Sequence, residues 1–311
     1  MRKKIAIIGG GLSGLYAAYQ LEQKGITDYV LLEARAHLGG RISDFLSNSQ
    51  SKSNSFDLGP TWFWPEFQPQ LSELIKSLKL ETFAQFEQGH TLIERSSSQP
   101  PTATPGYMHS PTSMRIKGGM GKLINALYAK LQNKHVVTSA SAESITYQQD
   151  SIEIRYSNSD KPNNTVYVEH VMLALPPRLA VEKIAFNPTL PSDVIAKWQN
   201  TATWMAPHAK YIAVYDTPFW RKQGLSGSAR SSAGPMVEIH DASYPQGQAA
   251  LFGFIGVPAT DRQRINNEDL KAYCRAQLAR LFGTQAATPE VDVIKDWAQD
   301  ELTSTHLDKH A

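Results

Sequence analysis

A glycine-rich turn near the N-terminus constrains the fold more than any other feature of this chain. An apolar run, Ile5–Ile8, leads directly into the spacing Gly-x-Gly-x-x-Gly at Gly9, Gly11 and Gly14. Apolar side chains then recur at helical spacing over residues 11–24. A buried strand that ends at such a turn and continues as a helix begins a βαβ unit, which predicts an α/β fold with a Rossmann-like parallel sheet.

The turn has the composition of a dinucleotide-binding site. Gly9 permits the tight turn, Gly11 lets the backbone approach a pyrophosphate, and Gly14 lets the helix pack closely on the strand. The free N–H groups at the helix N-terminus, where Ser13 lies, favour an anion. A glycine-rich turn with a purely structural role is the alternative interpretation.

A second apolar run, Tyr29–Leu32, completes the βαβ unit and ends at Glu33. An acidic residue at this place accepts hydrogen bonds from ribose hydroxyls and disfavours a 2′-phosphate. The strand, the helix, the second strand and the acid are therefore all in register for a dinucleotide. These residues alone leave NAD and FAD open.

The residues after Glu33 favour FAD. Ala34 and Arg35 follow directly, and Arg41 lies on a turn that contains Gly40. A guanidinium on such a turn can reach back to a pyrophosphate as a bidentate donor, a second clamp that NAD folds do not require. An ordinary surface turn with two arginines is the alternative.

Composition excludes several classes of function. The chain has 311 residues, with 31 Lys and Arg against 29 Asp and Glu, and this balance gives no electrostatic reason to expect nucleic acid or an anionic membrane as a partner. A single cysteine and nine dispersed histidines predict neither disulfides nor a metal site. The chain has no apolar stretch long enough to span a membrane, and the apolar run after Met1 is too short for a signal peptide, so we expect a cytoplasmic protein.

Together with motifs further along the sequence, these residues show that the chain resembles the flavin-containing amine oxidases, the family of monoamine and polyamine oxidases. The resemblance covers nearly the whole sequence. It is carried by the stretch from Gly9 to Arg41 and by the sequences DLGPTW at 57–62, GGM at 118–120, LALP at 173–176, FNPTLP at 186–191, PFWR at 218–221 and GLSG at 224–227.

The resemblance implies a two-domain fold and a cofactor. It implies an FAD-binding domain formed by residues 1–60 and 112–180, and a mixed-sheet substrate domain formed by residues 61–111 and 181–311. The expected activity is FAD-dependent oxidation of a small amine, by hydride transfer from its α-carbon to flavin N5 with oxygen as electron acceptor. The FAD is expected to be non-covalent. The stretch that runs beside the flavin in this family adds the candidate cofactor-binding residues Gly59, Pro60, Thr61 and Trp62.

The resemblance also marks Lys210 as the candidate catalytic residue. In this family a lysine ten residues before the tryptophan of the PFW sequence holds a water at flavin N5, and Lys210 stands at that position relative to Trp220. On a strand, Lys210 shares a face with Ile212 and Val214 and can point into a cavity while Tyr211 points away. A solvent-exposed lysine at the end of the strand is the alternative. Trp62, Phe63 and Trp64 form an aromatic cluster that either belongs to the core or lines a substrate tunnel.

Two departures from the family pattern bear on activity. Leu307 stands where the family has an aromatic residue of the substrate cage, and the glycine-rich stretch that follows in the family is not found before Ala311. We therefore expect this chain to hold FAD poorly and to self-associate or to use a partner chain that covers the incomplete side. A flavin-poor or inactive relative is one alternative, and a desaturase or protoporphyrinogen-type oxidase is another.

Overall fold

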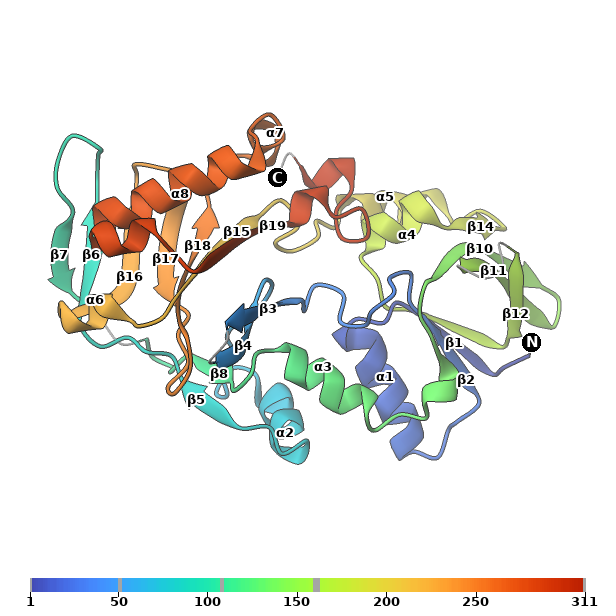
Figure 1. Cartoon of the computed structure of the whole chain (residues 1–311). Coiled ribbons are helices and arrows are strands. Elements are labelled where there is room, and N and C mark those ends of the chain that lie inside the picture. The colour runs from blue at the N-terminus through green and yellow to red at the C-terminus, as the bar shows by residue number, and fades with distance from the viewer. Residues whose placement is uncertain (1, 50–51, 107–108, 159–162, 310–311) are drawn as a thin grey trace.

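In a computed structural model, the structure describes residues 2–49, 52–106, 109–158 and 163–309. The molecule is elongated, with β-sheets at both ends and helices α1 and α3 between them along one side (Figure 1). In the described part of the chain, no helix has the length and apolar character needed to cross a membrane.

The N-terminal βαβ unit forms as the sequence predicts. Helix α1 spans Leu12–Gln23, and four parallel strands are ordered β13 (His170–Leu173), β1 (Ile5–Ile8), β2 (Tyr29–Leu32) and β9 (Val136–Val137). Alternate residues of β1 and β2 pack on opposite faces of this sheet. One face packs on α1 and on α3 (Gly121–Tyr128). The other packs on a second sheet, so both faces of the parallel sheet are buried, as its continuous apolar strands require.

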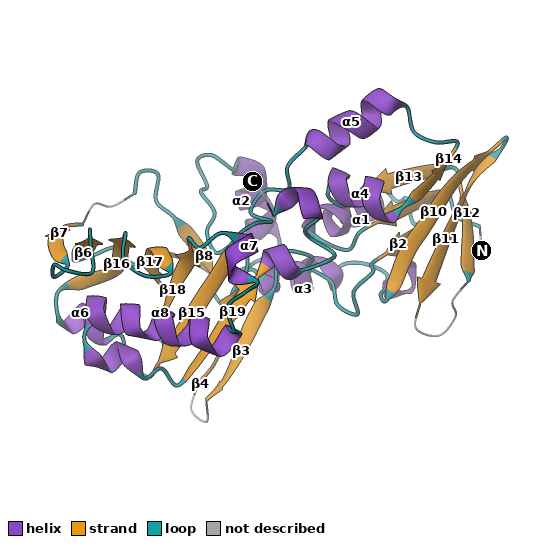
Figure 2. Cartoon of the chain, turned by 90° about the horizontal axis from the view of Figure 1, so that it is seen from above, coloured by secondary structure: helices purple, strands orange, loops and turns teal. Residues whose placement is uncertain are grey.

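That second sheet has the strand order β12 (Asn164–Val168), β11 (Ser151–Asn158), β10 (Ala140–Gln148) and β14 (Ala185–Asn187). Strand β14 pairs in parallel with β10, after helix α4 (Pro177–Lys183). Helix α5 (Ser192–Asn200) then leads toward the other end of the molecule (Figure 2). The division into two domains at the residues given above stays a prediction.

The far end of the molecule is a seven-stranded sheet. Its order is β19 (Val291–Asp296), β15 (Ala209–Tyr215), β18 (Ala249–Ile255), β17 (Met236–Asp241), β16 (Leu225–Ser231), β6 (His90–Glu94) and β7 (Thr102–Pro105). Helix α8 (Asn267–Phe282) covers one face, where it packs against Tyr211 and Leu251 (Figure 2). The opposite face carries Ile212 and Phe252 and faces the middle of the molecule.

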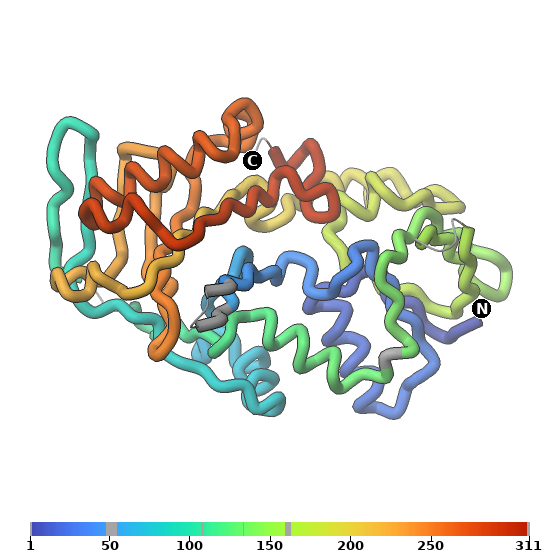
Figure 3. The backbone as a smooth tube through the Cα atoms, viewed as in Figure 1, coloured from blue at the N-terminus to red at the C-terminus, as the bar shows by residue number. Residues whose placement is uncertain are grey.

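Smaller elements connect the two ends. The hairpin of β3 (Asp44–Ser49) and β4 (Lys52–Asp57) lies in the middle of the molecule, and β5 (Thr82–Ala84) pairs with β8 (Met114–Ile116) near helix α2 (Pro69–Ser77) (Figures 1 and 3). The short helices α6 (Phe219–Lys222) and α7 (Ala259–Arg262) flank the seven-stranded sheet. Short 3-10 turns lie at Asn133–His135, Thr284–Ala287, Trp297–Gln299 and His306–Asp308.

Two local predictions from composition can be compared with the structure. The polar, low-complexity residues 50–55 predict a loop or hairpin tip: a hairpin of β3 and β4 does form here, but residues 52–55 lie in β4 itself, and residues 50–51 lie outside the described part. Residues 96–105 predict an irregular exposed loop or crossover, but Thr102–Pro105 forms the edge strand β7. Its β-branched threonines suit a strand, and a proline is tolerated at its end because an edge strand leaves N–H groups unpaired.

Candidate active site

A cavity of about 600 Å³ runs from the dinucleotide-binding turn to the seven-stranded sheet. It is within the size range of cofactor and ligand pockets. Of the predicted cofactor-binding residues, all except Gly14 line it: Gly9, Gly11, Ser13, Glu33, Ala34, Arg35, Gly40, Arg41, Gly59, Pro60, Thr61 and Trp62. The structure thus brings together two stretches that are separate in the sequence.

The turn itself has the geometry that its glycines predict. Gly9 has a φ of +111°, and a Cβ there would lie 2.5 Å from the carbonyl oxygen of Ala174. A Cβ on Gly14 would lie 1.9 Å from the carbonyl oxygen of Gly9, so Gly14 serves the packing of α1 on β1 and does not line the cavity. At Gly11, by contrast, the nearest atoms would be 3.9 Å away.

Glu33 is buried at the end of β2 and is held in place by backbone donors. One carboxylate oxygen accepts from the N–H of Gly10 at 2.6 Å, and the other accepts from the N–H of Arg35 at 2.8 Å. Each carboxylate oxygen has a further lone pair, so the group can still accept a hydrogen bond from a hydroxyl group in the cavity. The backbone therefore fixes the orientation of this carboxylate against the glycine-rich turn.

The two arginines of this region lie in the cavity wall and are joined to other segments. Arg35 Nη2 donates to Asp300 Oδ1 at 2.5 Å, and Asp300 Oδ2 accepts from Lys295 Nζ at 2.7 Å. Arg41 Nη1 donates to the carbonyl oxygen of Trp204 at 3.0 Å. Both guanidinium groups thus connect the nucleotide-binding part to the walls contributed by later residues.

Lys210 lies behind the cavity wall. It is buried, and it is not one of the lining residues. Its Nζ donates to the carbonyl oxygens of Asp57 at 2.6 Å and Gly59 at 3.1 Å, and to Thr61 Oγ1 at 2.7 Å. Lys210 does share a face of β15 with Ile212 and Val214, as predicted. Its ammonium, however, contacts the 57–61 stretch, which lies between Lys210 and the cavity.

Burial governs the charge state of this lysine. Loss of hydration lowers the pKa of Lys210, with Arg115 lowering it further and the Asp57 carboxylate opposing the shift. Burial likewise raises the pKa of Asp57, against the effects of Lys210, of Arg115 and of the backbone N–H of Met120, which donates to Asp57 at 2.7 Å. The Lys210 ammonium also lies 4.1 Å from the centre of the Phe252 ring.

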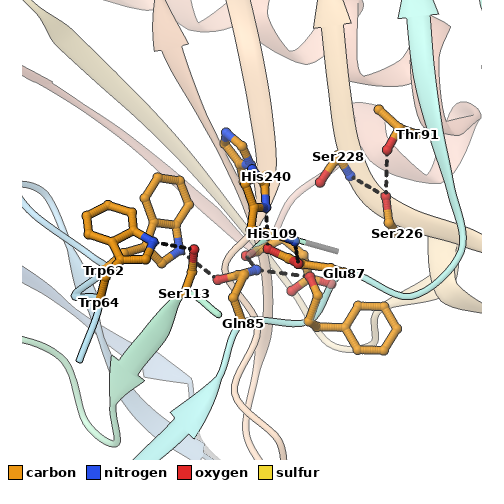
Figure 4. A network of polar contacts seen from close by, with 12 residues as sticks. Trp62, Trp64, Gln85, Glu87, Thr91, His109, Ser113, Ser226, Ser228 and His240 are labelled. Carbon is orange, nitrogen blue, oxygen red and sulfur yellow. Dashed lines mark hydrogen bonds and ion pairs between the residues drawn. The ribbon is translucent and has the colours of Figure 1, made fainter. Parts of the chain in front are cut away.

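Two tryptophans form the end of the cavity nearest the seven-stranded sheet. Trp62 Nε1 donates to Gln85 Oε1 at 2.9 Å, and Trp64 Nε1 donates to Ser113 Oγ at 2.9 Å (Figure 4). The ring of His240 meets Trp62 edge-on at 4.8 Å between centroids. Both indoles are therefore fixed. Of the aromatic cluster, Trp62 and Trp64 line the cavity, whereas Phe63 belongs to the core.

Several wall residues were not identified from the sequence. These are Ala140, Ser141 and Ala142 on β10, Leu179, Lys183 and Ile184 at α4, Trp204 and Met205, Phe254 on β18, and Leu302 and Thr303. Trp297, whose Nε1 donates to the carbonyl oxygen of Leu58 at 3.2 Å, also lines the cavity. Leu307, which we compared with the cage aromatic, is exposed and does not line it. The sequence of β10 gives no signal for its role, because small residues are common on any strand.

The residues present fit a dinucleotide. A Cβ at Gly11, the residue before the first turn of α1, would meet no atom closer than 3.9 Å, so a phosphate can approach the free N–H groups of that helix. The fixed carboxylate of Glu33 is placed for a ribose, and the aromatic walls at the far end suit a flat ring system. A Rossmann-like sheet with such a cavity at the carboxyl ends of its strands defines a dinucleotide-binding protein.

Comparisons of the sequence specify the family. The model of the family described as flavin containing amine oxidoreductase matches residues 85–308, and the model of the NAD(P)-binding Rossmann-like domain matches residues 7–78. The chain belongs to the flavin-containing amine oxidoreductase family. Its cofactor is accordingly FAD, and the fold expectation from the sequence is confirmed.

Individual relatives agree with this assignment. The chain is 24% identical to a probable flavin-containing monoamine oxidase A of Dictyostelium discoideum, over 96% of this chain and 84% of that protein. It is 27% identical to the putrescine oxidase of Kocuria rosea, over 61% of this chain and 41% of that protein. The first alignment runs over 399 positions, more than the 311 residues of this chain, so the Dictyostelium protein has internal segments that this chain lacks.

Solved structures share the fold. A putrescine oxidase bound to putrescine superposes with a TM-score of 0.84 over 98% of this chain and 87% of that chain, at 20% identity. The cyclohexylamine oxidase of Brevibacterium oxydans gives a TM-score of 0.84 over 97% and 86%, at 18% identity.

Proposed function

We propose that the protein is an FAD-dependent oxidase of small amines. In the proposed reaction a neutral amine gives a hydride from its α-carbon to flavin N5, the imine hydrolyses, and oxygen takes the electrons as peroxide. When bound, FAD supplies the redox chemistry, and the protein binds, orients and desolvates. The observation that carries the proposal is the single cavity that joins the dinucleotide-binding turn to the aromatic end at Trp62 and Trp64.

Different residues of the chain would bind different parts of the cofactor. Glu33 would accept hydrogen bonds from the ribose hydroxyls, and the first turn of α1 would face the pyrophosphate, with Arg35 and Arg41 beside it. Cys274, on α8, is buried in the core and does not line the cavity, which supports non-covalent binding.

The aromatic end would hold the amine. Trp62, Trp64 and Phe254 exclude water there, and the hydrogen bonds to Gln85 and Ser113 keep the two indoles from rotating. A desolvated amine next to these rings is held by its apolar body. The names of two relatives, putrescine oxidase and cyclohexylamine oxidase, support a primary amine as the substrate class.

The test is to supply the purified full chain with excess FAD and to measure flavin absorbance, flavin bleaching and peroxide release with a panel of amines. We expect bleaching under anaerobic conditions and peroxide in air. FAD that binds but is not reduced by any amine would overturn the amine assignment, and a desaturase-type substrate would be tested next. A chain that never binds FAD would instead favour the flavin-poor alternative.

A further inference from the structure

The three hydrogen-bond partners of Lys210 are not equivalent. The carbonyl oxygens of Asp57 and Gly59 can only accept a hydrogen bond, whereas the hydroxyl of Thr61 can accept or donate. A charged Lys210 has three protons and donates to all three partners. A neutral Lys210 has two protons and one lone pair, and only Thr61 can donate to that lone pair.

The direction of the Thr61 hydroxyl therefore depends on the charge of Lys210. With a charged lysine, the Thr61 proton is free to point to another acceptor. With a neutral lysine, that proton points to Nζ and a lone pair of Thr61 Oγ1 is left for another donor. Thr61 lines the cavity and Lys210 does not, so Thr61 is the member of this pair that a bound molecule can meet.

We propose that Thr61 is the cavity-side end of a proton relay, through which a protonated amine substrate passes one proton to Lys210. This inference rests on the proposed function. In the step, an N–H bond of the substrate ammonium breaks and its proton binds Thr61 Oγ1, while the Thr61 O–H bond breaks and its proton binds Lys210 Nζ. The amine becomes neutral, the lysine becomes charged, and nothing is oxidised or reduced.

The surroundings of Lys210 allow both charge states. Its ammonium faces the Asp57 carboxylate, the Arg115 guanidinium and the ring of Phe252, and Lys295 lies opposite it on β19. Arg115 disfavours the charged lysine, whereas Asp57 favours it. Burial lowers the pKa of Lys210 from the ordinary value of 10.5, which brings the neutral form closer to physiological pH.

The relay is tested with Thr61→Val, which removes the hydroxyl and keeps the shape, and Thr61→Ser, which keeps the hydroxyl. Thr303→Val is the matched control, because Thr303 also lines the cavity but its hydroxyl accepts from Arg35 at 3.2 Å. The first readout needs neither FAD nor amine: the pKa of Lys210 in the full chain, from NMR of lysine labelled at its ε-carbon, assigned with Lys210→Met.

We expect Thr61→Val to lower the pKa of Lys210 by about one unit, because the charged form loses the stronger hydrogen bond. Thr61→Ser and Thr303→Val should leave that pKa unchanged. The second readout is the pH profile of flavin reduction with excess FAD and amine. There Thr61→Val should slow the limiting rate by about 10²-fold or more, and Thr61→Ser should restore it within a few-fold.

If Thr61→Val does not fold, Thr61→Ala replaces it. A hydroxyl-free variant that keeps both the pKa of Lys210 and the pH profile would overturn the relay and leave the proposed function intact. A shifted lysine pKa together with no amine oxidation by the FAD-loaded wild type would reject the proposed function instead, because the NMR readout is independent of it.

Discussion

Single buried polar side chains organise this site, and the sequence predicts some of them better than others. Glu33 is predicted from the register of strand, turn and helix, and the structure places its buried carboxylate in the cavity wall beside the glycine-rich turn. For Lys210, strand alternation predicts the correct face of β15. It does not predict that the 57–61 stretch lies between the ammonium and the cavity, because that depends on how two segments 151 residues apart in sequence pack together.

Replacing Glu33 with Ala should weaken FAD binding by roughly ten- to a hundred-fold, because the ribose loses its charged acceptor. The backbone N–H groups of Gly10 and Arg35 lose an acceptor as well. Titration of the variant and the wild type with FAD, followed by flavin fluorescence, measures the change. Glu33→Gln keeps one acceptor oxygen and should lie between the two, and equal affinities for all three proteins would show that Glu33 does not bind the ribose.

The buried charges at Lys210 make stability depend on pH. The folded protein has a lowered lysine pKa, so between that value and 10.5 the unfolded chain binds more protons. The free energy of unfolding should therefore rise with pH across this window. Asp57 has the opposite effect on the free energy of unfolding. Its pKa is raised in the folded state, so just above pH 3.8 the folded state binds more protons than the unfolded chain. The contribution of Asp57 to the free energy of unfolding therefore falls as pH rises through this range.

Lys210→Met removes the first of these effects. We expect its free energy of unfolding to be lower than that of the wild type at high pH, because the carbonyls of Asp57 and Gly59 lose their donor, and to lack the rise above neutral pH. Urea unfolding at several pH values tests this. A variant whose pH dependence parallels that of the wild type would mean that Lys210 keeps an ordinary pKa in the folded protein.

Among the elements, periodic apolar patterns predict the long helices and central strands well and the edge strands poorly. The sequence pattern predicts a helix over residues 268–282, which is α8, and a strand over residues 210–215, which is β15; each prediction agrees with the structure within one residue. Strand β7 is polar and rich in threonine and proline, so nothing in its own composition shows that it pairs with β6. The segment from Trp297 to Asp308 has no apolar period, and its place is determined by ion pairs to distant residues.

Asp308 anchors that segment. Its buried carboxylate accepts from Arg178 Nη1 at 2.5 Å, from the N–H of Thr203 at 3.1 Å and from Thr305. Burial by itself would raise the pKa of Asp308, but the backbone donors of Thr305 and Thr203 and the Arg178 guanidinium outweigh it and hold the pKa below its ordinary value. The stabilisation is therefore present above the ordinary pKa of an aspartate and is lost as pH falls through the lowered value.

Asp308→Ala should lower the free energy of unfolding by roughly 3–5 kcal/mol, because it leaves the Arg178 charge without its buried partner. Asp193→Ala is the matched control. Its ion pair with Lys197 is exposed on α5 and should be worth less than about 1 kcal/mol. Urea denaturation at neutral pH compares the two, and equal losses would show that the contacts of Asp308 do not hold this segment in place.

At the scale of the whole molecule, the cavity depends on both ends of the fold. The parallel sheet contributes the glycine-rich turn and Glu33, and the seven-stranded sheet contributes Phe254 and, through β19, Trp297. No local pattern places β10 or Trp204 in the same wall, because their positions follow from the packing of whole sheets. Sequence motifs therefore predict the family, whereas they do not predict which residues form the cavity wall.

This arrangement predicts weak, reversible binding of FAD. The residues proposed to hold the adenosine and pyrophosphate line the cavity, but its wall also includes Trp204, which is 81% exposed. Apolar surface that stays in water does not gain the burial free energy of about 25 cal/mol per Å². A partly exposed flavin ring therefore contributes less to the binding free energy than a fully buried one. We expect little flavin on the chain after desalting.

Excess FAD should nevertheless raise the thermal unfolding midpoint by a few degrees, because a ligand at a hundred times its Kd stabilises the folded state by about 2.7 kcal/mol. Glu33→Ala should show a smaller rise at the same FAD concentration. Stoichiometric flavin after desalting would contradict weak binding, since it would require the walls at Trp204 and Trp297 to close over the ring. A midpoint that does not move even at high FAD would contradict binding in this cavity at all, and the role of its glycine-rich turn would then be structural.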